Sequence, residues 1–203
     1  MTNLYHEGNR RLQDQFDTRR LADRIEQRLD HETFDADDRA FIESRDMFFL
    51  ATADEHGLPQ CSYKGGEPGF VRVVDEHTLA FPNYDGNGTY LSMGNLLQNA
   101  QLGILFIDFT SPRRLRVNGL ASFVEDDPLL DAYPEAQFVV RVQATHVLPN
   151  CPRYVHRMEM VERSRFVPRA GCETPVPDWK RRAWSHDVLP HGDPALAEGL
   201  LSD

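Results

Sequence analysis

The 203-residue sequence lacks the features of a membrane-spanning or secreted chain. It contains no uninterrupted apolar run long enough to cross a bilayer, and residues 1–7 lack the basic and apolar regions of a secretory signal. Its three cysteines, Cys61, Cys151 and Cys172, are an odd number without paired spacing, which argues against a disulfide framework. A cytoplasmic protein with reduced thiols is therefore expected.

Motifs of several catalytic classes are also missing. Gly65 and Gly66 are not followed by the Gly-Lys-Ser/Thr of a phosphate loop, and no Gly-x-Gly-x-x-Gly opens a helix. The spacing of histidine and cysteine matches no zinc signature, so no metal is expected, and no serine lies in a nucleophile elbow. The sequence therefore gives no support for an NTPase, a Rossmann dehydrogenase, a zinc protein or a serine hydrolase.

Basic residues are scarce relative to acidic ones. Lysine and arginine number 22 against 32 aspartates and glutamates, which gives a formal net charge of −10. An acidic surface repels nucleic acid and anionic membranes, and no basic run is interleaved with aromatic residues. Neither nucleic acid nor a membrane is expected as a partner, and a phosphate-bearing ligand would need a locally basic pocket.

The patterns that are present predict a mostly β (α+β) chain. Residues 8–45 carry apolar side chains at helical spacing, and Asp35 can cap a helix that begins at Ala36. From Met47 onward, short apolar segments alternate with turn-forming clusters, which predicts about six or seven strands in a closed or nearly closed barrel. The side chains expected inside this barrel are Phe49, Leu79, Phe81, Leu105, Phe106 and Val117.

Prolines divide the end of the chain and exclude long regular elements there. We expect a C-terminal arm in this part of the sequence, where Trp179 and Trp184 are large aromatic side chains. The predicted organisation is a helical extension at residues 1–45, a barrel at 46–167 and the arm at 168–203, all within one structural domain.

The stretch from Thr78 to Asp108 combines a strand, a polar loop, a short helix and a second strand. Thr89 or Ser92 is expected to cap this helix. Free backbone N–H groups at a helix start favour an anion, so a phosphate could bind there. The residues expected on the buried side of the helix are Leu91, Leu96 and Leu97.

Three segments in this region carry a family resemblance. The stretches beginning at Phe81 (FPNYDGN), Asn95 (NLLQNAQLGILF) and Arg114 (RLRVNG) together resemble the pyridoxamine 5'-phosphate oxidase-like family of FMN-binding split barrels. The similarity extends upstream through residues 48–57 and 62–66. The resemblance implies a Greek-key-like split β-barrel that binds FMN and forms a homodimer with flavin at the interface.

A set of polar residues fits such a cofactor. The FMN phosphate carries close to two negative charges and accepts charge-assisted hydrogen bonds, whereas the isoalloxazine edge needs amide or backbone partners. Strand alternation places Arg114, Arg116 and Asn118 on one face, where the arginines could also simply face solvent. With the resemblance, the predicted cofactor-binding residues are Ser62, Lys64, Asn87, Gly88, Thr89, Ser92, Arg116 and Asn118, of which Lys64 and Arg116 are the expected phosphate partners.

Two departures separate the sequence from the vitamin B6 oxidase proper. The loop after Asn83-Tyr84 lacks the basic residues found there in those enzymes, and residues 178–182 (DWKRR) match their Arg-Leu-His-Asp-type substrate motif only loosely. The resemblance therefore implies a different branch of the family and identifies no catalytic acid or base.

The function expected from the resemblance is FMN-dependent transfer of hydride or electrons. The donor would be a reduced nicotinamide or another small organic substrate, and the acceptor a molecule such as oxygen. A non-catalytic flavin-binding or sensing module remains an alternative, as does a split barrel that holds a deazaflavin or haem. Because a small packed barrel has little free interior, the ring is expected in a groove closed by a second chain, which Trp179 and Trp184 could reach unless they anchor the arm to its own barrel.

Overall fold

The computed structural model describes residues 4–201, and the chain divides into two compact units, Met1–Met160 and Val161–Asp203. The limit between barrel and arm expected at residues 167/168 stays a prediction. The helices of the first unit are α1 (Glu7–Gln15), α2 (Arg19–Leu29), α3 (Ala36–Glu43), η1 (Leu130–Ala132) and α4 (Leu91–Gln98). Its strands are β1 (Met47–Ala53), β2 (Pro59–Gly65), β3 (Arg72–Val73), β4 (Thr78–Tyr84), β5 (Gln101–Asp108), β6 (Arg113–Phe123) and β7 (Ala136–Asn150).

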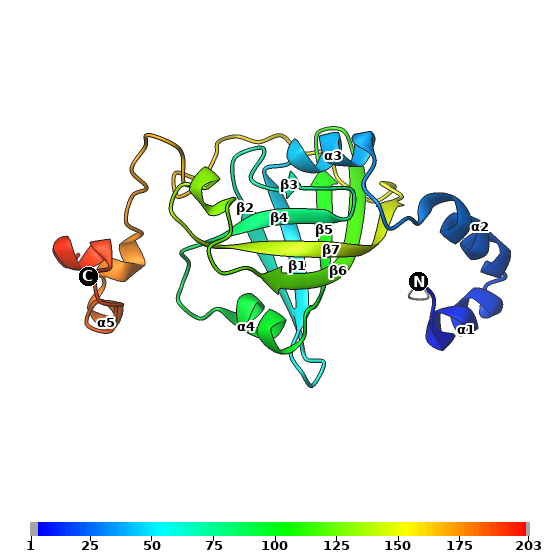
Figure 1. Ribbon diagram of the computed structural model, residues 1–203, viewed down its shortest axis with the longest axis horizontal. Coiled ribbons are helices and arrows are strands. Elements are labelled where there is room, and N and C mark those ends of the chain that lie inside the picture. Colours follow the sequence, from blue (N-terminus) through cyan, green and yellow to red (C-terminus); the bar gives the residue numbers. More distant parts are fainter. Residues whose placement is uncertain (1–3, 202–203) are drawn as a thin grey trace. The chain divides into compact units, whose positions relative to one another are not determined.

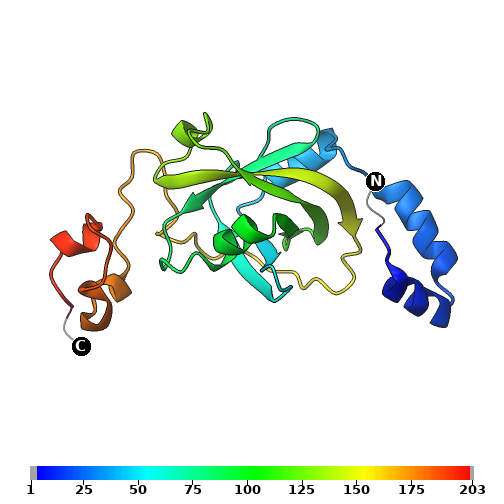
Figure 2. The ribbon, with the colours of Figure 1, turned by 60° about the horizontal axis from the view of Figure 1, so that its bottom comes forward.

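The seven strands form one antiparallel sheet in the order β2-β1-β5-β6-β7-β4-β3, which confirms the predicted mostly β fold. Phe48 of β1 packs edge-on against Phe81 of β4 with 5.0 Å between ring centroids, although these strands are not neighbours in the sheet. The sheet must therefore curl until its ends face one another, as Figures 1 and 2 show. The end strands β2 and β3 are not paired with each other within residues 4–201, so the barrel is split.

The barrel core is aromatic. Phe48, Phe81 and Phe106 are fully buried and contact one another around Phe48, and burial of each such side chain contributes roughly 1.5–3 kcal/mol. The prediction that Phe49 and Leu105 lie inside was wrong. Strand alternation sends Phe48 inward and its neighbour Phe49 outward, and both Phe49 and Leu105 are half-buried on the outer face. The predicted burial of Leu79, Phe81, Phe106 and Val117 is confirmed.

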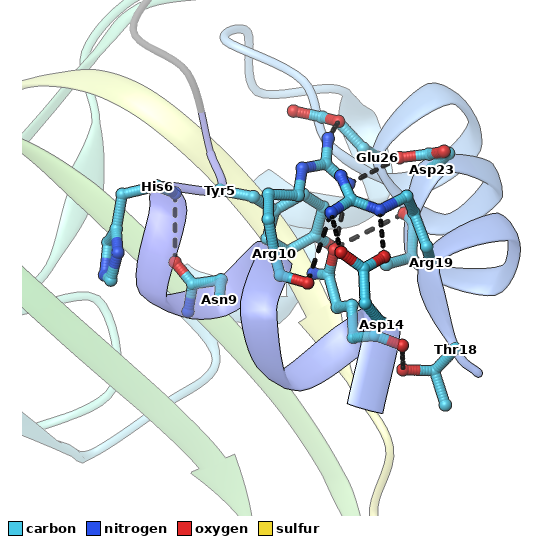
Figure 3. A network of polar contacts seen from close by, with 11 residues as sticks. Tyr5, His6, Asn9, Arg10, Asp14, Thr18, Arg19, Asp23 and Glu26 are labelled. Atoms are coloured by element: carbon cyan, nitrogen blue, oxygen red, sulfur yellow. Dashed lines mark hydrogen bonds and ion pairs between the residues drawn. The ribbon is translucent and has the colours of Figure 1, made fainter. Parts of the chain in front are cut away.

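Helices α1 and α2 pair mainly through charged side chains, as Figure 3 shows. Arg10 lies 2.5 Å from a carboxylate oxygen of Asp23 and 3.5 Å from one of Glu26, and Arg19 binds Asp14. No residue of either helix is buried. Since exposed ion pairs contribute little individually, this hairpin adds less to the stability of the unit than the barrel core does.

Helix α3 begins as the sequence predicts. The Asp35 side chain accepts a hydrogen bond from the backbone N–H of Asp38, and the Asp38 side chain accepts one from the backbone N–H of Asp35. The two bonds form a capping box. Within residues 4–201, no helix combines the length and the apolar composition needed to cross a membrane.

Strands β6 and β7 are joined through an irregularity at Gly119. Asn118 pairs with His146 whereas Gly119 pairs with Ala144, which leaves Thr145 as the extra residue of a bulge. A Cβ atom on Gly119 would lie only 2.5 Å from the backbone oxygen of Gln143. The close approach of the two backbones therefore requires glycine at this position.

The second unit is built from short helical turns, η2 (Asp178–Arg181), α5 (Ala183–His186) and η3 (Pro194–Ala197). Lys180 and Asp193 form a buried ion pair at 2.7 Å, which joins η2 to the residue preceding η3. The rings of Trp179 and Trp184 stack on each other with 6.0 Å between centroids. The tryptophans therefore pack together within this unit.

Candidate functional site

A cavity of about 330 Å³ lies between β2, the end of β4 and the segment that leads into α4. Its size is at the lower end of the range of roughly 300–1,000 Å³ that is usual for ligand sites. The structure brings together in its lining most of the predicted cofactor-binding residues, namely Ser62, Lys64, Asn87, Gly88, Thr89 and Ser92. The other lining residues are Gln60, Asn83, Tyr84, Gly86, Tyr90, Leu91 and Met93.

Strand β2 supplies the basic wall of the cavity. Its alternation turns Gln60, Ser62 and Lys64 toward the cavity, while Tyr63 points away and is 62% exposed. No carboxylate of the described residues forms an ion pair with Lys64. Burial lowers the pKa of its ammonium group, and no neighbouring charge contributes to that shift. A bound anion would offset this cost of burying the charged form.

The opposite wall is the start of α4. Its N-cap residue is Tyr90, whose φ of 47° is left-handed, and no side chain caps the helix. The prediction that Thr89 or Ser92 acts as the cap was therefore wrong. Thr89 instead donates its hydroxyl to Asn87 at 2.6 Å, and the hydroxyls of Ser92 and Ser62 share a hydrogen bond of 3.0 Å that joins α4 to β2.

The uncapped helix start leaves the backbone N–H groups of residues 91–93 available to a ligand, and all three residues line the cavity. The predicted buried side of α4 was correct only for Leu96. Leu91 and Leu97 are 56% and 70% exposed, because the helix packs on β1 and β2 through the face that carries Ser92 and Met93.

A hydrogen-bond network joins the cavity to β7. Asn83 and Tyr90, which line the cavity, both donate to the side-chain oxygen of Gln137, at 2.8 Å and 3.0 Å. Burial, together with Glu135 and Glu67, raises the pKa of the neighbouring Tyr84, so its phenol stays neutral and can donate. Sequence patterns gave no signal for Gln137, because it reaches the site only through the pairing of β4 with β7.

The structure does not bring Arg116 and Asn118 into this cavity. The predicted alternation of β6 is confirmed, with Leu115 and Val117 buried and Arg116 exposed on the outer face. Arg116 lies in register between Leu105 of β5 and Leu148 of β7. A role for Arg116 and Asn118 in cofactor binding stays a prediction.

Metal-binding side chains do not form a cluster in the described part of the chain. Among residues 4–201, no group of three or more histidine, cysteine, aspartate or glutamate side chains is arranged to hold a metal ion. The chemistry of the cavity is instead that of one cation, several hydroxyls and side-chain amides.

The sequence profile of the pyridoxamine 5'-phosphate oxidase family matches residues 34–165, which is more than half of the chain. The chain belongs to this family. The matched segment includes α3, every strand of the sheet and the whole lining of the cavity, whereas α1, α2 and the helical turns of the second unit lie outside it.

Solved structures similar to this chain include HupZ from Group A Streptococcus, at 16% identity and a TM-score of 0.47, with 62% of this chain and 99% of that chain covered. An FMN-binding protein from Syntrophomonas wolfei is 14% identical with a TM-score of 0.44, covering 69% of this chain and 97% of that one. The haem storage protein HutZ from Vibrio cholerae is 22% identical with a TM-score of 0.36, covering 55% and 88%. No curated protein matches the sequence.

Proposed function

We propose that this member of the family is an FMN-dependent oxidoreductase that transfers hydride or electrons between a small organic donor, such as a reduced nicotinamide, and an acceptor such as oxygen. The observation that carries the proposal is the ammonium group of Lys64, which has no carboxylate partner among the described residues and faces the uncapped start of α4 within one cavity. This arrangement suits a phosphate, because it combines a cation with free backbone donors.

The remaining lining residues fit the rest of FMN. Side-chain hydroxyls of Ser62 and Ser92 can bond the phosphate or the ribityl chain, while Asn83, Tyr84 and Met93 provide polar and apolar contacts for a planar ring. When bound, FMN would supply the hydride and electron chemistry. The residues of this chain would hold the phosphate, orient the ring and exclude water from the part of it that the cavity covers.

Purified protein is expected to take up FMN in preference to FAD. The cavity presents one phosphate-sized group of donors, and the sequence has no fingerprint for an adenylate half. Quenching of flavin fluorescence during titration with FMN and with FAD measures the two affinities. FAD binding as tight as FMN binding would contradict the single-phosphate site, and a lack of response to FMN would exclude FMN as the ligand.

The same preparation separates the alternative functions. Oxidation of a reduced nicotinamide by the FMN-loaded protein would indicate an enzyme, whereas tight flavin binding without turnover of any donor would favour a binding or sensing module. Parallel titrations with a deazaflavin and with haem identify the ligand class if FMN fails.

We further propose that the protein is a homodimer with flavin at its interface. On the outer face of the sheet, Tyr63, Phe49 and Leu105 lie side by side in register on β2, β1 and β5, and Tyr63 is 62% exposed. An aromatic and aliphatic row of this kind suits a self-complementary contact between two chains. Because Tyr63 points away from the cavity, the row supports the dimer alone, and flavin at the interface is what the family resemblance implies. A dimer is expected in sedimentation velocity at low micromolar concentration, and Tyr63→Glu should shift it toward monomer. A wild-type monomer that retains flavin would refute the shared site.

A further inference from the structure

We propose that Asn83 selects the ring of the cofactor by accepting a hydrogen bond from an imide N–H through its side-chain oxygen, and that Gln137 and Tyr90 are positioning residues for this contact. The inference rests on the proposed flavin function. Asn83 would recognise the isoalloxazine ring, whereas the donors around Lys64 would recognise only the phosphate at the other end of FMN.

The orientation of the Asn83 amide follows from its neighbours. Its nitrogen donates to the backbone carbonyl of Tyr84 at 3.4 Å and to the side-chain oxygen of Gln137 at 2.8 Å. A backbone carbonyl can only accept, so the nitrogen of Asn83 and not its oxygen must face Tyr84. Gln137 must then present its oxygen to Asn83, and the hydroxyl of Tyr90 donates to that same oxygen at 3.0 Å.

This orientation leaves the side-chain oxygen of Asn83 as an acceptor without a donor among residues 4–201. Asn83 lines the cavity and is only 8% exposed. Its side-chain oxygen is therefore open to a hydrogen bond from a ligand N–H in the cavity. The isoalloxazine ring carries one such N–H, at N3 between its two carbonyl groups, and a deazaflavin keeps it. Haem, with iron bound to its ring nitrogens, has no ring N–H to offer.

The backbone conformation of Tyr90 indicates that the hydrogen-bond network fixes the start of α4, which forms one wall of the cavity. A φ of 47° is uncommon for a residue with a bulky side chain, and its cost must be offset by contacts elsewhere. The bond from its hydroxyl to Gln137 is such a contact, and it ties the start of α4 to β7. Gln137 itself does not line the cavity and has an exposed side chain, so its substitution need not disturb the core.

The test compares FMN with its N3-methyl derivative, which lacks the N–H but keeps the phosphate. The wild type is expected to bind FMN at least about fivefold more tightly, the effect of one neutral hydrogen bond. In Gln137→Leu the Asn83 amide loses its shorter bond and keeps only the 3.4 Å bond to the carbonyl of Tyr84, so its oxygen is held less firmly and this ratio should fall. Gln137→Glu keeps an acceptor for both Asn83 and Tyr90, and should retain the ratio. The melting temperature of the flavin-free variants should stay close to that of the wild type.

The outcomes distinguish this inference from the function on which it rests. Equal binding of the two flavins by the wild type would overturn the role of Asn83 and leave the FMN site standing. An N3-methyl penalty that is unchanged in Gln137→Leu would overturn the positioning role of Gln137. Failure of the wild type to bind FMN would overturn both. If Gln137→Leu does not fold, Gln137→Met keeps the length of the side chain and also removes the acceptor for Asn83, and its ratio must then fall.

Discussion

Replacing Lys64 with methionine is expected to weaken FMN binding by roughly 10- to 100-fold and to change riboflavin binding by less than about twofold. A charge-assisted hydrogen bond is worth roughly 1.5–3 kcal/mol, and only FMN has a phosphate to lose. Methionine keeps the length and apolar stem of the side chain, so the wall that β2 gives to the cavity should persist. Fluorescence titration of both flavins against the wild type and the variant measures the two ratios.

Two further variants make this result specific. Arg20→Met removes the same charge from a side chain that is 90% exposed on α2, and it should leave both affinities unchanged. Arg116→Met tests the second predicted phosphate partner, which lies outside the cavity of its own chain. A selective loss of FMN affinity there would require Arg116 to act on the site of another chain. Equal losses of FMN and riboflavin in Lys64→Met would show that Lys64 supports the fold and not a phosphate.

Gly119→Ala is expected to destabilise the protein by about 3 kcal/mol, since overpacking that also displaces backbone lies at the upper end of such effects. The added methyl group would meet the backbone oxygen of Gln143 at 2.5 Å and the side chain of Val142 at 2.7 Å. The oxygen of Gln143 belongs to the backbone, so it cannot move away without disturbing the pairing of β6 with β7. Urea denaturation followed by circular dichroism gives the loss in the free energy of unfolding.

Gly103→Ala is the matched control on the neighbouring strand. The nearest atoms to its added methyl group would be 3.5 Å and 3.9 Å away, which is ordinary van der Waals contact. Its free energy of unfolding should stay within about 1 kcal/mol of the wild type, since glycine itself carries an entropic cost in a strand. If the two variants lost equal stability, close packing at the bulge could not be the reason for glycine at position 119.

Sequence patterns predicted the fold well where one local rule decides the structure. The alternation of apolar segments with turn-forming clusters after Met47 predicted the strands of the sheet, and Asp35 caps α3 as its side chain suggests. The patterns failed where two neighbouring residues were equally apolar. Phe48 and Phe49 have the same chemistry, and only the register of β1 against β2 and β5 decides which of them is buried.

The candidate site was only partly predictable for a related reason. Lys64 and the loop residues Asn87 to Thr89 lie in segments whose order along the chain carries the family resemblance, and they do meet in one cavity. Gln137 lies more than fifty positions from Asn83, with which it bonds, and no local pattern relates the two. Such contacts depend on how the strands are ordered in the sheet, which periodicity alone does not specify.

The split in the barrel has a mechanical consequence for the cavity. One wall stands on β2, at one end of the sheet, and another on β4, next to the opposite end, and no ladder of hydrogen bonds joins these strands directly. The distance between the walls is therefore set largely by what fills the space behind them, including the contact of Phe48 with Phe81. A substitution deep in the barrel can therefore change the width of the cavity, and with it the affinity for a ligand, without replacing any residue that lines the cavity.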